Sequence, residues 1–215
     1  MFVRHARLDI AEKYLDPKSE DVVLSVGCKR GELERALVAK VKEVHATDIE
    51  DPTGDEDAHS NDGIQFTISD VTKGLPYPDN TFDKVLFLEV IEHVPSGTEH
   101  KALQEIYRVL KPGGRLAFST PNKHPVSCAM DPAYWLEGHR HYRPTTIQNM
   151  MESCGFTVND LQVNGAWRES FLLPVYYLAI RTGMKKLSHN WIHNQINKEY
   201  SKKGWYTISV CATKL

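Results

Sequence analysis

The chain has 215 residues, of which 41% are apolar and 25% are charged, so it is long enough for a single domain with a substantial core. Its net charge of −2 argues against a nucleic-acid partner attracted by bulk electrostatics, because such domains usually carry a basic excess. Residues 1–15 lack the apolar stretch of a signal peptide, and no apolar run is long enough to cross a bilayer. Four widely spaced cysteines without a C-x-x-C pair favour reduced thiols and a cytoplasmic location.

Short apolar runs alternate with helical patterns, which predicts an α/β fold with a mainly parallel sheet. Runs such as "VVLSV" at 22–26 and "KVLFL" at 84–88 are typical of parallel strands buried on both faces. The last run, "YTISVCAT" at 206–213, alternates instead, so we expect that strand nearer an edge of the sheet. In chain order the predicted strands are Val22–Val26, Val44–Thr47, Ile64–Ile68, Lys84–Leu88, Arg115–Ser119, Thr157–Val163 and Tyr206–Thr213.

Two helices carry recognisable start and stop signals. Ser96 and Glu99 have the S-x-x-E spacing of a capping box, and Pro112-Gly113-Gly114 predicts the end of the helix that follows it. A second helix is predicted from Thr145 or Thr146 to Gly155. Each has apolar residues at helical spacing, which predicts one buried face. These are Leu103, Ile106, Tyr107 and Leu110 in the first helix and Ile147, Met150, Met151 and Cys154 in the second.

Two segments interrupt this alternation. Residues 50–63, "EDPTGDEDAHSNDG", are acidic and rich in turn-forming residues, which predicts a surface loop where a helix would be expected. Residues 171–204 form an apolar and then basic insertion before the last strand. Our first interpretation is a helix packed over the sheet, and the alternatives are a lid or a peripheral membrane contact through residues 171–187. We interpret the nearby tryptophans as packing residues: Trp167, Trp191 and Trp205.

The stretch "VVLSVGCKRGELERAL" at 22–37 joins an apolar strand to a helix through a glycine turn. Gly27 and Gly31 let the backbone approach a ligand closely, and the helix that follows offers unpaired N–H groups. Asp48 ends the next strand about twenty residues beyond the turn, the spacing at which a carboxylate binds ribose hydroxyls. The turn alone is equally consistent with a simple chain reversal, but the two features together favour an adenosine-containing cofactor.

Later segments carry a more specific pattern: "ISDVTKGLPYPDNTFDKVLFLEVIEHV" at 68–94 and "EIYRVLKPGGRLAFSTPN" at 105–122. Over residues 22–156 the order of motifs resembles that of the class I S-adenosylmethionine-dependent methyltransferases. The resemblance implies S-adenosyl-L-methionine as cofactor and a Rossmann-like, doubly wound, mixed seven-stranded sheet with helices on both faces and an antiparallel last strand. It also implies that Asp70 reaches the adenine amino group. The implied cofactor-binding residues are Gly27, Cys28, Gly31, Asp48, Ile49, Asp70, Val71 and Glu89.

Two positions of the glycine turn depart from the pattern of this family. Ser25 stands where an acid is usual, and Lys29 stands where the middle glycine is usual. The lysine must point its side chain outward or fill part of the pocket, and the serine removes a polar anchor near the amino-acid end of the cofactor. These changes predict weakened cofactor binding.

Candidates for chemistry on the acceptor lie in two segments. Methyl transfer is an in-line displacement from an activated donor, so a base is needed only if the acceptor must lose a proton. His93 follows the fourth predicted strand, at the carboxyl edge where α/β folds bind ligands. His139, His141 and Tyr142 lie in "EGHRHYRPTT" at 137–146, where the resemblance places the mouth of the active site. A structural role is the alternative for all four, and no second cluster completes a metal site.

The leading interpretation is a methyltransferase that acts on a small-molecule or lipid-like acceptor, apolar or anionic in character. The first alternative is a non-catalytic binding protein of the same fold, which the two departures in the turn motivate. A nicotinamide-dependent oxidoreductase is the second alternative, because the glycine turn and Asp48 suit that cofactor too. The missing middle glycine and the motifs after Ile68 argue against it.

Overall fold

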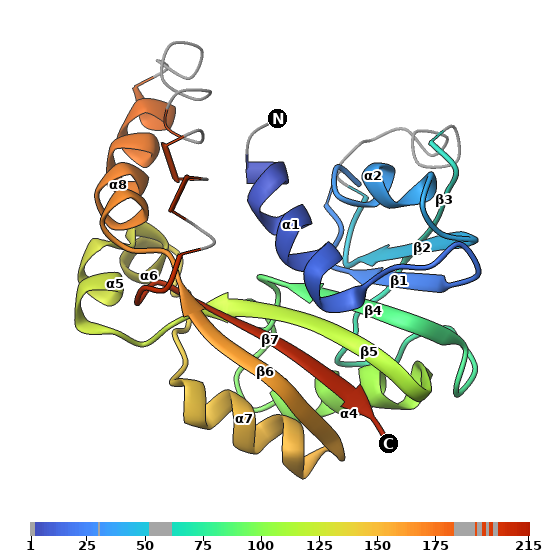
Figure 1. The fold of residues 1–215 in the computed structure, drawn as a ribbon. Coiled ribbons are helices and arrows are strands. Elements are labelled where there is room, and N and C mark those ends of the chain that lie inside the picture. The colour runs from blue at the N-terminus through green and yellow to red at the C-terminus, as the bar shows by residue number, and fades with distance from the viewer. Residues whose placement is uncertain are drawn as a thin grey trace.

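The structure is a computed structural model that describes residues 3–29, 31–51, 62–182, 192, 195–196, 198–199 and 202–215. These residues form a mixed sheet of seven strands in the order β3-β2-β1-β4-β5-β7-β6 (Figure 1). The strands β1 to β5 pair in parallel, and β7 is antiparallel to both of its neighbours. This confirms the predicted fold class. The strands are β1 Val22–Val26, β2 Glu43–Asp48, β3 Ile64–Ile68, β4 Phe82–Leu88, β5 Leu110–Pro121, β6 Phe156–Asn164 and β7 Thr207–Lys214.

Helices cover both faces of the sheet (Figure 1). On one face α1 contacts β4, β5 and β7, and α2 contacts β2 and β3. On the other face α4 contacts β5 and α7 contacts β6. Each face buries its own apolar cluster, so the strands are buried on both sides as their continuous apolar runs predict. The helices are α1 Val3–Leu15, α2 Glu34–Val38, α4 Glu99–Val109, α5 Pro125–Met130, α6 Pro132–Leu136, α7 Pro144–Ser153 and α8 Trp167–Arg181.

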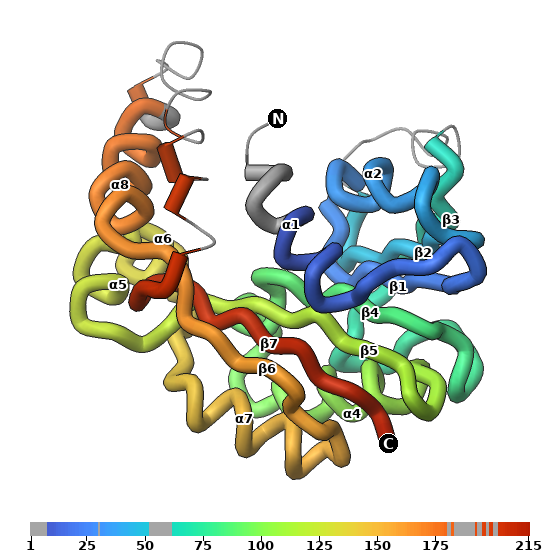
Figure 2. The backbone as a smooth tube through the Cα atoms, in the orientation of Figure 1, coloured from blue at the N-terminus to red at the C-terminus, as the bar shows by residue number. Residues whose placement is uncertain are grey.

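The last strand lies next to an edge of the sheet, as predicted, but the reason given for that position is wrong. The strand β7 lies between β5 and β6, and β6 forms the edge (Figure 2). The hydroxyl residues that make its sequence alternate, such as Thr207 and Ser209, are fully buried. One of them has a polar partner inside the sheet, because Asn164 Nδ2 donates to Ser209 Oγ at 3.4 Å. Small hydroxyl side chains can therefore occupy a buried face, and alternation here does not mark an exposed one.

The predicted start of the first recognisable helix is also wrong. Thr98, without a side-chain cap, precedes α4, and Ser96 does not form a capping box. Glu99 Oε2 accepts a hydrogen bond from the Gly97 amide at 2.7 Å, so the carboxylate caps the preceding turn instead. The helix ends at Val109 and β5 begins at Leu110, before the Pro-Gly-Gly sequence that was expected to separate them. The start and end predicted for α7 agree with the structure, and Gly155 follows it with φ +97°.

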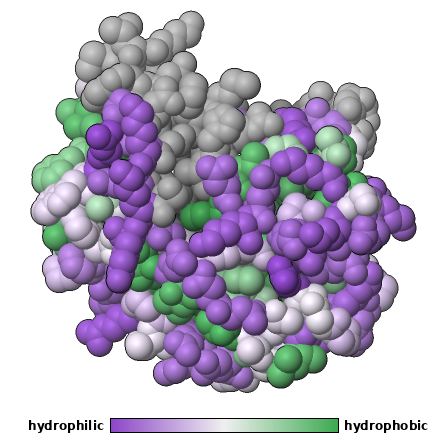
Figure 3. All heavy atoms as spheres, viewed as in Figure 1, coloured by the Kyte–Doolittle hydropathy of each residue, from purple (hydrophilic) through white to green (hydrophobic). Residues whose placement is uncertain are grey.

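The insertion begins as the helix α8, four residues earlier than predicted. Its Leu172, Leu173 and Tyr176 pack against the apolar cluster that includes α1 residues, but the main contacts of α8 are with α5 and α6 and not with the sheet that it was expected to cover. Its other face exposes apolar side chains, and Figure 3 shows apolar residues along the rim beside α8. The exposed residues are Trp167, Phe171, Val175 and Leu178. Residues 183–191, with Trp191, and residues 52–61 of the acidic loop lie outside the described residues.

No helix within the described ranges has both the length and the apolar character needed to cross a membrane. All four cysteines are free, as predicted, and Cys28 and Cys211 are buried. The indole of Trp205 donates to Ser170 Oγ at 3.2 Å and lies edge-on to Trp167 at 4.8 Å between ring centroids. These contacts support the packing role expected for both tryptophans.

Candidate active site

The glycine turn lies directly against the loop that follows β4. Gly27 has φ +79°, a backbone conformation that side chains other than glycine rarely adopt. A Cβ atom added at this position would lie 2.3 Å from Cγ2 of Val90, which leaves no room for any side chain. The Gly27 amide donates to the Thr47 carbonyl at 2.7 Å and the Cys28 amide donates to the same oxygen at 3.2 Å. The turn is therefore held between β2 and the loop after β4.

Lys29 keeps the backbone conformation of the glycine that it replaces. Its φ is +48°, in the left-handed region, and its amide donates to Asp48 Oδ2 at 2.8 Å. The lysine side chain is exposed. The side chain is therefore not buried within the turn.

The end of β2 presents a carboxylate and an apolar side chain next to the turn. Asp48 Oδ1 accepts a hydrogen bond from the Ile49 amide at 2.8 Å, and Oδ2 accepts the Lys29 bond. A carboxylate has about four acceptor positions, so both oxygens can still receive ribose hydroxyls. The Ile49 side chain is 70% exposed beside it, an apolar surface of the kind on which a flat ring packs.

Three further predicted residues lie along the same edge of the sheet. Asp70 Oδ1 accepts hydrogen bonds from the amide and hydroxyl of Thr72, and the hydroxyl bond is the main reason why the pKa of Asp70 is lowered. Val71 is buried in the core beneath this turn. Glu89 follows β4 with φ +55° and accepts a hydrogen bond from Ser119 Oγ at 2.6 Å. Gly31 has φ +67° and closes the glycine turn by donating to the Cys28 carbonyl at 3.0 Å.

A buried carboxyl that the sequence analysis missed lies beside the turn. Ser25 Oγ donates to Glu34 Oε1 at 2.5 Å, and Glu34 is only 1% exposed. Burial raises the pKa of Glu34, and the Ser25 bond opposes that shift. Burial also raises the pKa of the Cys28 thiol, and the negative charges of Glu34 and Asp48 raise it further. Acidic residues are common in the first turn of a helix, so Glu34 does not stand out in the sequence. Only the absence of an acid at Ser25 could have drawn attention to Glu34.

The loop at 137–146 is fastened to the loop after β4. Arg140 forms an ion pair with Glu99 at 2.5 Å and donates to the carbonyls of Ile91 and Val94. The Tyr142 hydroxyl lies 3.2 Å from Glu99 Oε1 and 3.3 Å from the Ile91 carbonyl. Burial is the largest cause that raises the pKa of Tyr142. Arg140 and Tyr142 thus position this loop, and the hydroxyl of Tyr142 is committed to that contact.

The two predicted histidines of this loop have different surroundings. The His141 side chain is completely buried, with Nε2 at 2.9 Å from Asp131 Oδ2 and Nδ1 at 3.5 Å from the Cys128 thiol. These contacts favour a structural role for His141. The His139 ring lies edge-on to His93, with 4.2 Å between ring centroids, and its Nε2 lies 3.5 Å from Glu137. The structure therefore brings together His93 and His139, which are separated by forty-six positions in the sequence.

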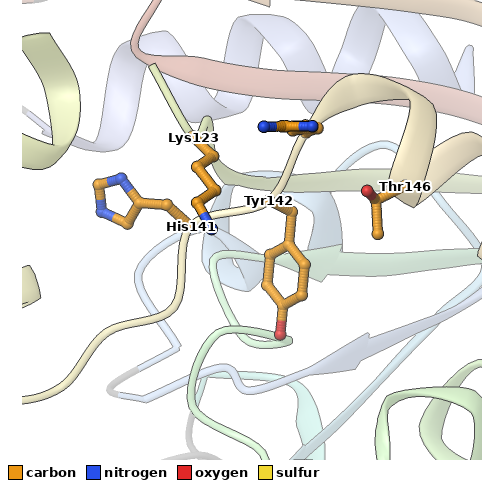
Figure 4. A pocket seen from close by; sticks show the side chains of 5 residues that line it. Lys123, His141, Tyr142 and Thr146 are labelled. Atoms are coloured by element: carbon orange, nitrogen blue, oxygen red, sulfur yellow. The ribbon is translucent and has the colours of Figure 1, made fainter. Parts of the chain in front are cut away.

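Two cavities open beside these loops. The first has a volume of about 440 Å³ and is lined by Lys123, His141, Tyr142, Arg143 and Thr146 (Figure 4). Figure 4 shows the Lys123 side chain extending toward Tyr142, whose hydroxyl points to the loop after β4. The second has a volume of about 460 Å³ and shares Lys123 and His141 with the first. Its other lining residues are Tyr134, Trp135, Gly138, His139 and Arg140.

The fold, and the glycine turn and Asp48 at the carboxyl edge of its sheet, are those of a class I S-adenosylmethionine-dependent methyltransferase. A family model described as a methyltransferase domain matches residues 2–161, so the chain belongs to this family. S-adenosyl-L-methionine is the cofactor of the class, and the residues present fit it: Asp48 keeps acceptor capacity, Ile49 is exposed, and the Lys29 side chain is not buried within the turn. Family membership favours this cofactor over the nicotinamide alternative.

Curated relatives of the chain include methyltransferases of quinone biosynthesis. The ubiquinone biosynthesis O-methyltransferase of Pseudomonas savastanoi is 34% identical over 110 residues, which cover 48% of this chain and 45% of that protein. The ubiquinone/menaquinone biosynthesis C-methyltransferase of Hydrogenovibrio crunogenus is 39% identical over 105 residues, covering 45% of this chain and 40% of that protein. The chain thus spans less than half the length of either relative.

Solved structures share the fold over nearly the whole chain. The [4+2]-cyclase SpnF superimposes with a TM-score of 0.71 at 19% identity, covering 97% of this chain and 80% of that protein. The geranyl diphosphate C-methyltransferase of Streptomyces coelicolor has a TM-score of 0.68 at 15% identity, covering 98% of this chain and 78% of that protein. Similarity at this level of identity establishes the fold and nothing more specific.

Replacing Lys29 with glycine is expected to leave cofactor affinity unchanged or to raise it. Glycine removes about 1 kcal/mol of left-handed backbone strain, which the larger conformational freedom of the unfolded chain partly offsets, so stability should change little. Calorimetric titration with S-adenosylhomocysteine and thermal unfolding measure the two effects. Lys29→Ala is the matched control, because it removes the same side chain and keeps the strain. A large loss of affinity in both variants would identify the lysine as a cofactor contact.

Proposed function

We propose that the chain transfers the methyl group of S-adenosylmethionine to a small-molecule acceptor by in-line displacement. One observation carries the proposal: a single loop, residues 89–94, joins the cofactor edge to the cavities. Val90 in this loop packs against Gly27 of the turn, and His93 contacts His139, which lines the second cavity. An acceptor that enters through that cavity would reach the cofactor's methyl group alongside this loop.

The chain's own residues align the reactants and, where needed, accept a proton. The cofactor supplies an activated methyl group, so holding the acceptor in line provides much of the rate enhancement. Asp48 and Asp70 would hold the ribose and the adenine, with Gly27 permitting close approach and Ile49 packing on the ring. Of the four predicted acceptor-side residues, His139 and His93 are the candidates for a base, because His141 and Tyr142 are engaged in structural contacts.

The cavities favour an acceptor that carries negative charge or an ionisable hydroxyl. Lys123 and Arg143 line the first cavity, and neither forms an ion pair within the described part of the chain. Two cations on a cavity wall attract an anionic group, and Arg143 can bind it through two parallel hydrogen bonds. The names of two curated relatives place those proteins in the biosynthesis of quinones, which are small molecules.

An apolar or lipid-like acceptor is supported by the outer face of α8. Its exposed stripe of Trp167, Phe171, Val175 and Leu178 lies beside α6, which exposes Trp135 at the second cavity. The same stripe supports a peripheral membrane contact by the apolar part of residues 171–187, since exposed apolar side chains can be buried at the boundary of lipid headgroups and acyl chains.

A titration followed by a transfer assay tests the proposed function. S-adenosylmethionine and S-adenosylhomocysteine are titrated into the protein by calorimetry, and labelled methyl transfer is then measured against a panel of quinols, phenols and prenyl phosphates. Binding with transfer supports the enzyme. Binding without transfer to any acceptor of the panel supports the second candidate, a non-catalytic binding protein, which the departures at Ser25 and Lys29 motivate. No binding at millimolar concentration contradicts both.

Asp48→Ala is expected to weaken cofactor binding by about 1–3 kcal/mol, the cost of leaving polar partners unpaired. The same substitution frees the amides of Lys29 and Ile49, so the turn itself should loosen. Calorimetric titration gives the affinity, and Asp48→Asn serves as the control because it keeps one acceptor at the same place. An unchanged dissociation constant in the alanine variant would mean that the ribose binds elsewhere.

A further inference from the structure

The buried Glu34 carboxyl has one oxygen that nothing satisfies. Oε1 accepts the Ser25 hydroxyl at 2.5 Å, whereas Oε2 is buried without a hydrogen-bond partner in the part of the chain that the structure describes. Burying an unpaired polar atom costs stability, so it calls for an explanation other than packing. Glu34 begins α2, three residues after Gly31, and its carboxyl meets the position on β1 where an acid is usual in this family.

Glu34 and Asp48 approach the glycine turn from two sides. Both carboxylates act electrostatically on the Cys28 thiol, which lies inside the turn. Arg35 is the charged group with an electrostatic effect on Glu34 among the described residues, and its own Nε pairs with Asp62 at 2.7 Å. The turn is thus bordered by two acidic groups, one exposed toward the ribose position and one beneath it.

We propose that Glu34 is the counter-charge for the ammonium and sulfonium groups of the cofactor, in place of the acid missing at Ser25. The inference rests on the proposed function and deepens it. A serine hydroxyl cannot neutralise a cation, but it can hold a carboxyl that reaches the same place from α2. In a low-dielectric site such a charge acts over several ångströms without direct contact.

The proposal couples cofactor binding to proton release. Burial raises the pKa of Glu34 in the free protein, so the carboxyl holds a proton over a wider pH range than an exposed one. A cation that binds beside it favours the ionised form, and the proton leaves to solvent. S-adenosylmethionine carries a sulfonium charge that S-adenosylhomocysteine lacks, so Glu34 should favour the methyl donor over the product.

Titration of the Glu34→Gln variant tests the proposal. Glutamine has the shape of the protonated acid and can still accept the Ser25 bond. The dissociation constant for S-adenosylmethionine is expected to rise roughly 5- to 50-fold, a typical coupling between two sites, and that for S-adenosylhomocysteine by less. Repeating the titrations in buffers of different ionisation enthalpy should show proton release in the wild type and none in the variant.

Two control variants isolate the buried carboxyl. Glu32→Gln removes an exposed acid from the same turn, and its affinities should stay within about twofold of the wild type, as expected for a screened surface charge. The double variant Ser25→Asp/Glu34→Gln returns the acid to β1 and should recover affinity for S-adenosylmethionine.

Unfolding of the ligand-free protein separates this role from a structural one. Between the ordinary and the raised pKa, the folded state binds more protons at Glu34 than the unfolded state does, so stability falls as pH rises through that window. Glu34→Gln should therefore be at least as stable as the wild type at pH 8. Lower stability with equal loss of both ligands, or unchanged affinity and proton release, overturns the proposal. Absence of binding by the wild type would instead contradict the proposed function.

Discussion

In the His139→Gln variant, kcat for an acceptor that loses a proton on methylation is expected to fall by about 10²- to 10⁴-fold, the usual contribution of a positioned general base. The dissociation constant for S-adenosylhomocysteine should not change, because His139 lies on the cavity side of the loop after β4. The measurement is the pH dependence of kcat with the acceptor found in the transfer screen.

His139 is favoured as the base by its surroundings. It lines the second cavity and its ring rests against His93, whereas the neighbouring His141 has no exposed side-chain surface and pairs with Asp131. A matched control is His100→Gln, since His100 is an exposed histidine that contacts Ser153 on the outer side of α4. If His139→Gln left kcat unchanged while His93→Gln lowered it, the base would be the other member of the pair. If His139→Gln and His93→Gln instead lost cofactor affinity to the same extent, both histidines would have a structural role.

The sequence predicted the sheet well because its strands are buried on both faces. The run "VVLSV" corresponds residue for residue to β1, and "KVLFL" lies within β4 with two residues added at its start. Such runs have no polar face to obscure them, and parallel pairing follows from the helices between them. The error at β7 arose where this logic does not hold. Thr207 and Ser209 are polar residues of β7 that are buried because helices and loops cover their face of the sheet. Periodicity alone cannot reveal that such a face is covered.

The candidate site could be predicted only where it depends on local sequence. Gly27 acts through its backbone conformation, and Asp48 acts through its position at the end of β2. The amide of Lys29, two residues after Gly27, donates to Asp48 and so joins the turn to β2. The contact between His93 and His139 depends on Arg140 reaching Glu99, an ion pair between residues forty-one positions apart. The contact between Ser25 and Glu34 depends on the angle at which α2 leaves the turn. No pattern within a single element encodes either contact.

Gly27→Ala is expected to lower the free energy of unfolding by about 2–4 kcal/mol and to reduce cofactor affinity. About 1–2 kcal/mol comes from a left-handed conformation that alanine does not favour, and the rest from overpacking against Val90. The new Cβ would lie 2.3 Å from Val90 Cγ2, a stiff branched side chain that cannot rotate away. Urea unfolding measures the stability, and titration with S-adenosylhomocysteine measures the affinity.

Two further variants separate the backbone strain from the clash. Gly113 has φ +77°, almost the value at Gly27, and an added Cβ there meets nothing within 4 Å, so Gly113→Ala should show the strain alone. In Gly27→Ala/Val90→Ala the nearest Val90 atom that remains is Cβ at 3.4 Å, an ordinary contact, so the overpacking cost should disappear. If the double variant regains stability but not affinity, the ligand itself needs the space above Gly27. If it regains both, the glycine serves the packing of the loop after β4, and close approach of the cofactor at this position is contradicted.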